Sequence, residues 1–154
     1  MNLPNAEVYA IDISAPALAT AKRNAQHNNV KVTFIETDIL RIDDLKQQFD
    51  IIVSNPPYVR QLEKSEIRTN VLDHEPHLAL FVDDDDALVF YKKIVRLAIK
   101  NLNPKGQLYF EINQYMGKEM MDLLETSGFQ SMELRKDIYG NNRMVKGVFS
   151  DQSQ

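Results

Sequence analysis

The clearest chemical signal in the sequence is Asn55-Pro56-Pro57-Tyr58, which directly follows the apolar run Ile51-Ile52-Val53. The prolines stiffen the segment and carry no N–H, so backbone carbonyls are left as acceptors beside an Asn side chain that both donates and accepts. Tyr58 adds an aromatic wall. This set can hold a planar group that bears an NH2, with its N–H bonds directed at the Asn oxygen and a proline carbonyl. The other interpretation is a simple Pro-Pro turn after a strand.

Two carboxylates stand at the ends of two further apolar runs. Asp12 follows Val8-Tyr9-Ala10-Ile11, where it can bond both ribose hydroxyls of a nucleotide-like cofactor or serve the start of the next helix. Asp38 follows Val32-Thr33-Phe34-Ile35 and can accept a hydrogen bond from an exocyclic amine such as adenine N6, while Ile39 packs on the ring. Ligand sites in open α/β sheets lie at the carboxyl ends of strands, so three such ends together predict a binding site.

The sequence gives little support for a metal site or for thiol chemistry. His74 and His77 lie three residues apart, but Pro76 between them disfavours a regular helix. The acidic run Asp83–Asp86 is typical of a solvated loop or a helix start. The chain has no cysteine, which excludes disulfides, thiolate nucleophiles and iron–sulfur clusters. We therefore predict no metal site.

The elements that must position these residues alternate between strand and helix. Ser14 can cap a helix that runs to Asn28-Asn29, and the apolar spacing from Leu88 to Leu102 predicts a longer amphipathic helix. The pattern also predicts a short helix over residues 42–48, a turn over 103–106, a helix that ends at Gly128, and strands over 108–112, 131–135 and 144–149. These elements predict an α/β fold with a parallel sheet between helices and an antiparallel strand pair at one edge.

Length and charge narrow the class of protein. The 154 residues fit one domain of ordinary size. With 22 acidic and 18 basic residues, the net charge of −4 excludes a whole-surface basic field for nucleic acid, although a local patch stays open. No apolar run approaches the roughly 20 residues that a membrane span needs. Residues Met1–Asn5 do not resemble a secretion signal. We therefore expect a cytoplasmic protein that does not engage a membrane.

These residues resemble the release-factor glutamine N5-methyltransferases (the HemK/PrmC family), which are class I S-adenosylmethionine-dependent methyltransferases. The resemblance runs over nearly the whole chain. Asn-Pro-Pro-Tyr alone is shared with adenine-N6 and other amino-group methyltransferases, whereas Glu75-Pro76 and the ending from Arg135 to Arg143 point to the glutamine branch. The segments that carry the resemblance are 10–14, 17–18, 21–25, 49–59, 75–76, 78–80, 90–91, 108–112, 135–137, 140–141 and Arg143.

The resemblance implies a Rossmann-like sheet, S-adenosylmethionine as the cofactor, and methyl transfer to an amide nitrogen. The accepting amide is the glutamine side chain in the Gly-Gly-Gln loop of a peptide-chain release factor. The roles that the resemblance implies are catalysis by Asn55, Pro56 and Tyr58, substrate binding by Asn55, Pro56, Pro57 and Tyr58, and cofactor binding by Asp12, Asp38, Ile39 and Asn55.

The family pattern also exposes a gap. Its catalytic domain opens with a strand and a glycine-rich loop that cradles the cofactor, after an upstream helical domain that helps to dock the release factor. This sequence starts where the second strand of the family is expected, so residues 1–154 are predicted to form a single, partial catalytic domain. The absent strand is central, between the strands at 8–11 and 51–53. We expect these two edges to self-associate or to pair directly, and the chain to bind S-adenosylmethionine poorly.

Two other interpretations stay open. An adenine-N6 methyltransferase acting on nucleic acid would use the same Asn-Pro-Pro-Tyr motif, but the acidic balance and the absence of a target-recognition domain weigh against it. A non-catalytic remnant of the fold would keep the sheet without the cofactor loop. A release factor is therefore the predicted partner, and nucleic acid is not the expected direct substrate.

Overall fold

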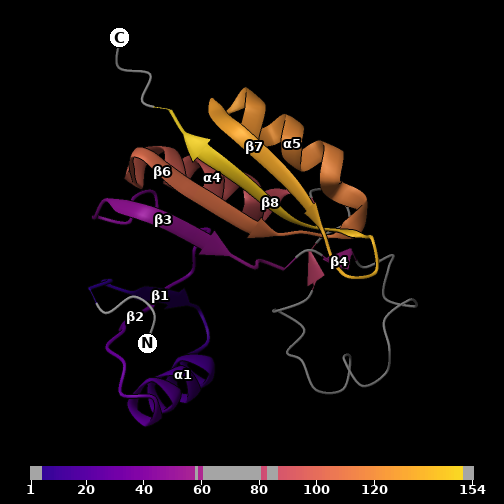
Figure 1. Ribbon diagram of the computed structural model, residues 1–154. Coiled ribbons are helices and arrows are strands. Elements are labelled where there is room, and N and C mark those ends of the chain that lie inside the picture. Colours follow the sequence, from indigo (N-terminus) through magenta and orange to yellow (C-terminus); the bar gives the residue numbers. More distant parts are fainter. Residues whose placement is uncertain (1–4, 58, 61–80, 83–86, 151–154) are drawn as a thin grey trace. The chain divides into compact units, whose positions relative to one another are not determined.

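The computed structural model describes residues 5–57, 59–60, 81–82 and 87–150, which are drawn in colour in Figure 1. The chain divides into two compact units, residues 1–43 and residues 44–154. They are called the N-terminal unit and the C-terminal unit below, and each is described by itself.

The N-terminal unit is a β–α–β arrangement with a parallel strand pair. Strand β1 pairs with β2 in a register that sets Tyr9 opposite Thr33 and Asp12 opposite Glu36. Helix α1 connects the two strands and buries Leu18. The elements are β1 (Tyr9–Asp12), α1 (Ala15–His27) and β2 (Thr33–Glu36). Both predicted strands and the predicted helix are confirmed to within a residue or two at each end.

The ends of α1 follow from local chemistry. Ser14 Oγ accepts a hydrogen bond from the Ala17 backbone N–H at 3.2 Å, and Pro16 sits in the first turn, where it costs no helical hydrogen bond. At the other end the Asn28 side chain donates to the Asn24 carbonyl at 2.8 Å. Asn29 takes a left-handed φ of 52°, which Asn tolerates and which stops the helix.

The C-terminal unit is built on a four-stranded mixed sheet in the order β3-β6-β8-β7. Strands β3 and β6 are parallel, whereas β8 is antiparallel to both β6 and β7. The predicted antiparallel pair at one edge is thereby confirmed. The strands are β3 (Phe49–Ser54), β6 (Leu102–Glu111), β7 (Phe129–Lys136) and β8 (Asn142–Phe149), with a separate short parallel pair of β4 (Val59–Arg60) and β5 (Phe81–Val82).

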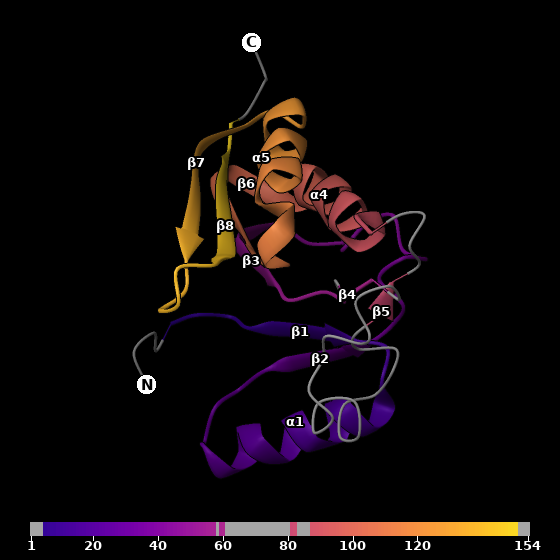
Figure 2. The ribbon, with the colours of Figure 1, turned by 90° about the vertical axis from the view of Figure 1, so that its right-hand side faces the viewer.

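Two helices cover one face of this sheet (Figure 2). Helix α4 buries Tyr91, Ile94 and Val95, and α5 buries Met120 and Leu124. They meet a layer of strand side chains that includes the fully buried Leu108 and Phe110. The Tyr91 and Phe110 rings pack edge to face with centroids 5.2 Å apart. The helices are α4 (Val89–Asn101), the short 3-10 helix η3 (Gln114–Met116) and α5 (Gly117–Thr126).

The predicted helix over residues 42–48 is wrong. This segment forms bends, and Lys46 has a φ of 61°. Asn101, which is 2% exposed at the end of α4, donates to Asp44 Oδ1 at 3.1 Å and to the Gln47 carbonyl at 2.9 Å, and accepts from the Leu45 N–H at 3.1 Å. A buried amide that satisfies the loop backbone overrides the helical spacing of the loop's own residues.

Strand β6 starts earlier than predicted. The predicted turn over 103–106 lies inside β6, where the register jumps from Phe49 opposite Leu102 to Ile51 opposite Gln107. Lys105 takes a left-handed φ of 66°. Residues 103–106 therefore form a bulge-like irregularity within the strand and do not separate a helix from a strand.

Within the residues that the structure describes, β1 forms a ladder with β2 in the N-terminal unit, and β3 forms one with β6 in the C-terminal unit. Self-association or direct pairing of the β1 and β3 edges stays a prediction. Among residues 5–57, 59–60, 81–82 and 87–150, no helix has the length and apolar character to cross a bilayer.

Candidate functional site

The carboxyl end of β3 lies beside the carboxyl end of β6. Because the two strands are parallel and Ser54 faces Phe110, the residues after Ser54 run alongside Glu111 and those that follow it. Strand β8 is antiparallel and sets Met144 opposite Glu111, so the start of β8 reaches the same edge. This edge of the four-stranded sheet, called the carboxyl edge below, gathers polar residues from three strands.

Asn55, Pro56 and Pro57 continue from β3 at this edge. Asn55 is exposed, Pro56 is buried and Pro57 is half-buried. A residue before proline is restricted to extended backbone, so the chain leaves the strand without bending back. Asn55 is thus exposed at the carboxyl end of β3, directly before the two prolines. Tyr58 lies outside the described residues.

Helix α4 and η3 brace the end of β6. The Tyr91 hydroxyl, which belongs to α4, donates to the Glu111 carbonyl at 3.0 Å. Asn113, which is 5% exposed, accepts the Tyr115 N–H on its side-chain oxygen at 3.1 Å and so starts η3. The Ile112 N–H donates to the Arg143 carbonyl at 2.9 Å and extends the pairing with β8. The edge is therefore held by backbone and side-chain hydrogen bonds beyond the strands themselves.

The turn between β7 and β8 is organised by Asp137. Its Oδ1 accepts the N–H groups of Tyr139 at 2.9 Å and Asn141 at 3.0 Å, and Arg143 Nε lies 3.5 Å from Oδ2. These interactions, led by the Asn141 N–H, lower the pKa of the Asp137 carboxyl. Gly140 has a φ of 86°, which glycine adopts without strain. The segment from Lys136 to Arg143, which carries part of the family resemblance, is thus a closed, hydrogen-bonded turn.

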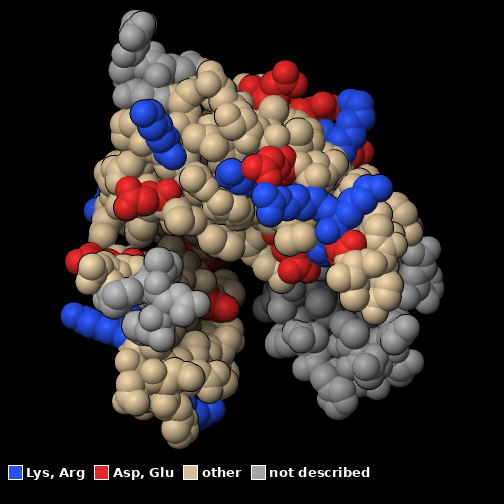
Figure 3. All heavy atoms as spheres, in the orientation of Figure 1, with Lys and Arg blue, Asp and Glu red and all other residues tan. Residues whose placement is uncertain are grey.

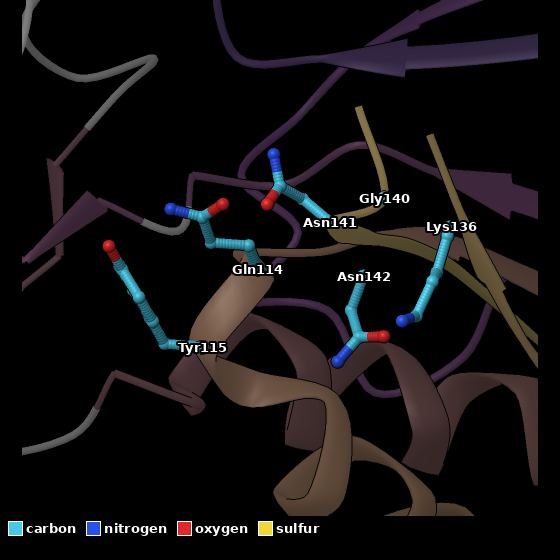
Figure 4. A pocket seen from close by; sticks show the side chains of 6 residues that line it. All are labelled: Gln114, Tyr115, Lys136, Gly140, Asn141 and Asn142. Atoms are coloured by element: carbon cyan, nitrogen blue, oxygen red, sulfur yellow. The ribbon is translucent and has the colours of Figure 1, made fainter. Parts of the chain in front are cut away.

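A crevice of about 200 Å³ opens at this edge between η3 and the β7–β8 turn. Figure 4 shows Gln114 and Tyr115 extending from η3, with Lys136 and Asn142 at the facing strand ends. The six residues that line it are Gln114, Tyr115, Lys136, Gly140, Asn141 and Asn142. Three of them carry a side-chain amide, so the lining is rich in paired donors and acceptors.

The other two predicted ligand carboxylates lie in the N-terminal unit, at neighbouring strand ends. Asp12 ends β1, and the Thr37 N–H donates to its carbonyl at 3.1 Å, which brings the end of β2 alongside. Asp12 Oδ1 accepts the Ser14 N–H at 2.7 Å. Asp38 Oδ1 accepts the Leu40 N–H at 2.9 Å, and its Oδ2 lies 3.2 Å from Arg41 Nε. The structure brings Asp12 and Asp38 to one edge, with the half-buried Ile39 next along the chain.

Charges of both signs mix on the sheet face opposite the helices. Glu133 on β7 lies between Arg135 of the same strand and Lys146 of β8, whose Nζ is 3.1 Å from Glu133 Oε1. Hydrogen bonds from Arg135 and then Lys146 lower the pKa of Glu133. Figure 3 shows blue and red side chains side by side over β7 and β8. This face carries ion pairs rather than a field of one sign.

The sequence reasoning missed Asn113, Gln114 and the crevice. Asn113 lies two residues after the end of β6, and Asn55 directly follows β3, so the same strand-end rule could have found Asn113. The segments with His74, His77 and Asp83–Asp86 lie outside the described residues, and across the described ranges no three His, Asp or Glu side chains gather to hold a metal ion.

Comparison with known proteins adds a family and several relatives. The family described as "Methyltransferase domain" matches residues 1–153. A release factor glutamine methyltransferase from Flavobacterium psychrophilum is 65% identical over 148 residues, which are 96% of this chain and 52% of that protein. One from Bacteroides thetaiotaomicron is 47% identical over 145 residues, 94% of this chain and 52% of that protein. The chain spans about half the length of these curated relatives.

Solved structures agree on the fold. A methyltransferase from Pyrococcus furiosus matches with a TM-score of 0.66 and 17% identity, covering 96% of this chain and 64% of that one. At that identity the likeness speaks for the α/β fold alone. The resemblance predicted from the sequence is confirmed by the names of the relatives, and the predicted fold class by the structural match.

Proposed function

The chain belongs to the methyltransferase domain family, and we propose that it supplies most of the catalytic domain of an enzyme that methylates the side-chain amide of glutamine in a release factor. The 65% identity to a protein named release factor glutamine methyltransferase carries this proposal. In this proposal, residues 1–154 act as one partial catalytic domain in the cytoplasm. The N-terminal unit contributes to cofactor binding, and the carboxyl edge receives the substrate amide.

The N-terminal unit offers suitable acceptors for part of S-adenosylmethionine. When bound, this cofactor supplies a methyl group from its sulfonium centre. Asp12, with one oxygen held by the Ser14 N–H, keeps lone pairs for ribose hydroxyls. Asp38 is 26% exposed and can accept from an exocyclic amine, with Ile39 against the ring. The glycine-rich cradle expected of the family has no counterpart in residues 1–154.

Asn55 and Pro56 would hold the substrate amide. Its two N–H groups donate to Asn55 Oδ1 and to the Pro56 carbonyl, which leaves the nitrogen lone pair directed at the methyl group. S-adenosylmethionine would supply the methyl group and leave as the neutral thioether S-adenosylhomocysteine, and the methylated nitrogen would give one proton to solvent while Asn55 and Pro56 hold it in place. Positive charge develops on nitrogen only during transfer, so acceptors placed there favour the transition state over the ground state. In this proposal, Pro57 and Tyr58 also contact the substrate amide and complete its binding site.

A methyl-transfer assay tests the function. The 154-residue chain is compared with one extended by the segment that precedes the matched region in the Flavobacterium relative. Both receive labelled S-adenosylmethionine and a purified release factor, and mass spectrometry locates the methyl group. Methylation of the Gly-Gly-Gln glutamine by the extended chain, and poor cofactor binding by the short one, are expected. A release factor with that glutamine replaced by alanine is the control.

The same assay separates the alternatives. Methyl incorporation into DNA or RNA but not into the release factor would establish the adenine-N6 function. Absence of both cofactor binding and methyl transfer in the extended chain would favour a non-catalytic remnant. Equal cofactor affinity of the two chains would contradict the proposal that residues 1–154 are an incomplete catalytic domain.

Self-association through the strand edges belongs to the same proposal. Strand β3 ends its sheet in the described part of the chain, and Ile51 and Val53 on it are 54% and 73% exposed. An apolar edge strand exposes unpaired backbone N–H and C=O groups, with which a strand of another chain can pair. Light scattering should therefore find association in the short chain, reduced by Val53→Lys. A monomer at all concentrations would contradict this part.

A further inference from the structure

The crevice between η3 and the β7–β8 turn lies on the same edge of the sheet as Asn55. Two ladder spacings separate β3 from β8 through β6, which is about 10 Å at ~4.8 Å each. Three residues of extended peptide cover about 10 Å. A substrate whose glutamine reaches Asn55 can therefore lay its neighbouring residues in the crevice.

The size of the crevice favours a short stretch of peptide. At about 200 Å³ it is smaller than the roughly 300–1,000 Å³ of pockets that enclose a whole cofactor or drug-sized ligand. Its amides, from Gln114, Asn141 and Asn142, each offer a donor and an acceptor. A peptide backbone presents one donor and one acceptor per residue, so this lining is chemically complementary to it.

The walls are already ordered. Asp137 and Asn141 exchange hydrogen bonds across the turn, including one from the Asp137 N–H to the Asn141 carbonyl at 2.8 Å. Asn142 packs against Gly117, where an added Cβ would lie only 2.6 Å from Asn142 Nδ2. A fixed wall loses little conformational entropy on binding, which favours affinity.

The rim exposes apolar side chains that the fold does not bury. Ile138 is 92% exposed, Tyr139 is 82% exposed and Tyr115 is 61% exposed. Rings and aliphatic groups presented from an ordered turn are typical of protein-contacting surfaces. Together with the amide lining, they favour a protein substrate over a free small molecule.

We propose that this crevice is a docking subsite for the peptide that flanks the methyl-accepting glutamine, about three residues from it. Gln114 and Asn141 bond the peptide backbone, and Tyr115 and Tyr139 cover its side chains. The inference rests on the proposed function, since it takes the release factor as the substrate. It adds a specificity-determining surface that lies away from the Asn-Pro-Pro-Tyr segment.

The test uses the extended chain with the substitutions Gln114→Ala and Asn141→Ala together. The matched control is Gln26→Ala with Gln130→Ala, which removes two exposed amides from α1 and from the start of β7. We expect the crevice variant to raise KM for the release factor about tenfold, since two hydrogen-bonding groups are lost, with kcat and cofactor affinity unchanged. Matching circular dichroism melts of all proteins check the fold.

Each outcome decides the inference. An unchanged KM, with release factor methylated normally, would overturn the subsite and leave the proposed function standing. A parallel loss of kcat and cofactor affinity would also overturn it, because a docking group acts on KM alone. If the parent protein does not methylate a release factor, both proposals fall.

A peptide-length series gives a second measurement. Glutamine peptides are lengthened one residue at a time on each side. On one side, affinity should rise when the third residue is added, and this rise should vanish in the Gln114→Ala, Asn141→Ala variant. Affinity that is independent of length would overturn the inference.

Discussion

The two units of the chain differ in how much of their surface they bury. In the N-terminal unit, Leu18 is the one buried hydrophobic side chain among the described residues, and its sheet has two strands. In the C-terminal unit, two helices and four strands enclose Tyr91, Leu108, Phe110 and many others. A helix that buries one side chain adds little to a two-stranded sheet, which is marginally stable by itself, whereas a four-stranded sheet with a helical layer has a core of its own.

This difference in core size coincides with the two roles proposed for the units, which are cofactor binding and substrate binding. The N-terminal unit carries the carboxylates proposed for the cofactor, on short strands with little core to hold them. The C-terminal unit carries Asn55 and the crevice on an edge braced by Tyr91, Asn113 and Asp137. The edge proposed to receive the substrate is therefore held by hydrogen bonds within residues 44–154, whereas the strand ends proposed to bind the cofactor have a small core within residues 1–43.

The largest expected contrast is in core stability. Leu108→Ala removes a fully buried side chain from β6 and should lower the free energy of unfolding by about 2.7–5 kcal/mol. Leu18→Ala removes the side chain that anchors α1 and should cost about 2 kcal/mol, since its thinner surroundings collapse more easily. Urea unfolding followed by circular dichroism measures both.

Hydrogen exchange sharpens this contrast. Amides of β1 and β2 should exchange faster than those of β6 and β8, and Leu18→Ala should accelerate only the former. Equal protection in both units would show that they unfold together and would remove the distinction.

Asn55→Ala tests the substrate side. It should reduce methyl transfer by the extended chain about 10²–10³-fold, the scale for one lost transition-state hydrogen-bonding group. Cofactor affinity should change much less. Asn24→Ala, an exposed amide on α1, is the matched control and should keep full activity. Near-normal turnover of the Asn55 variant would remove this residue from the mechanism.

Asp12→Ala tests the cofactor side. It should weaken S-adenosylmethionine binding by about 1.5–3 kcal/mol, or about 10–150-fold, through loss of a charge-assisted hydrogen bond. Asp12→Asn keeps an acceptor for the Ser14 N–H and should lose less. Glu36→Ala is the control, since it removes the carboxylate directly opposite Asp12 in the β1–β2 register. Equal losses of S-adenosylmethionine affinity in the Asp12 and Glu36 variants, measured by calorimetry, would show that negative charge near the site affects binding and that Asp12 makes no specific hydrogen bond to the cofactor.

Most elements with a strong local signal could be predicted from the sequence. Ser14 with Pro16 fixed the start of α1, and two prolines after β3 fixed the end of that strand. The positions of Asp12, Asp38 and Asn55 at strand ends followed from the same apolar runs. These features depend on residues close in sequence, so a single chain reveals them.

What could not be predicted depends on distant partners. The segment 42–48 has helical spacing, but Asn101, more than fifty residues away, bonds its backbone in another conformation. The crevice is formed by η3 and the β7–β8 turn, which the pairing of β6 with β8 brings together. The depth of a crevice and the exposure of Ile138 are tertiary properties that no local pattern reports.

The smallest expected effect concerns pH and again falls in the C-terminal unit. Hydrogen bonds from the Asn141 N–H and others lower the pKa of Asp137 below its ordinary value of 3.8. Between these two values the unfolded chain binds more protons than the folded one, so stability rises with pH there. The contribution of Asp137 is full above the unfolded pKa and is lost as the pH falls through the folded pKa.

Asp137→Asn isolates this contribution, because asparagine keeps an oxygen for the Tyr139 and Asn141 N–H groups but carries no charge. The variant should be less stable than the parent at pH 6, and the gap should narrow as the pH falls below 3.8 and close below the lowered folded pKa of Asp137, where the parent carboxyl is also neutral. Urea midpoints from pH 6 to pH 2.5 measure it. Arg143→Gln should retain most of the acid dependence, since backbone hydrogen bonds rather than the ion pair lead the shift. A gap between parent and Asp137→Asn that stays constant with pH would show that the turn does not depend on this charge.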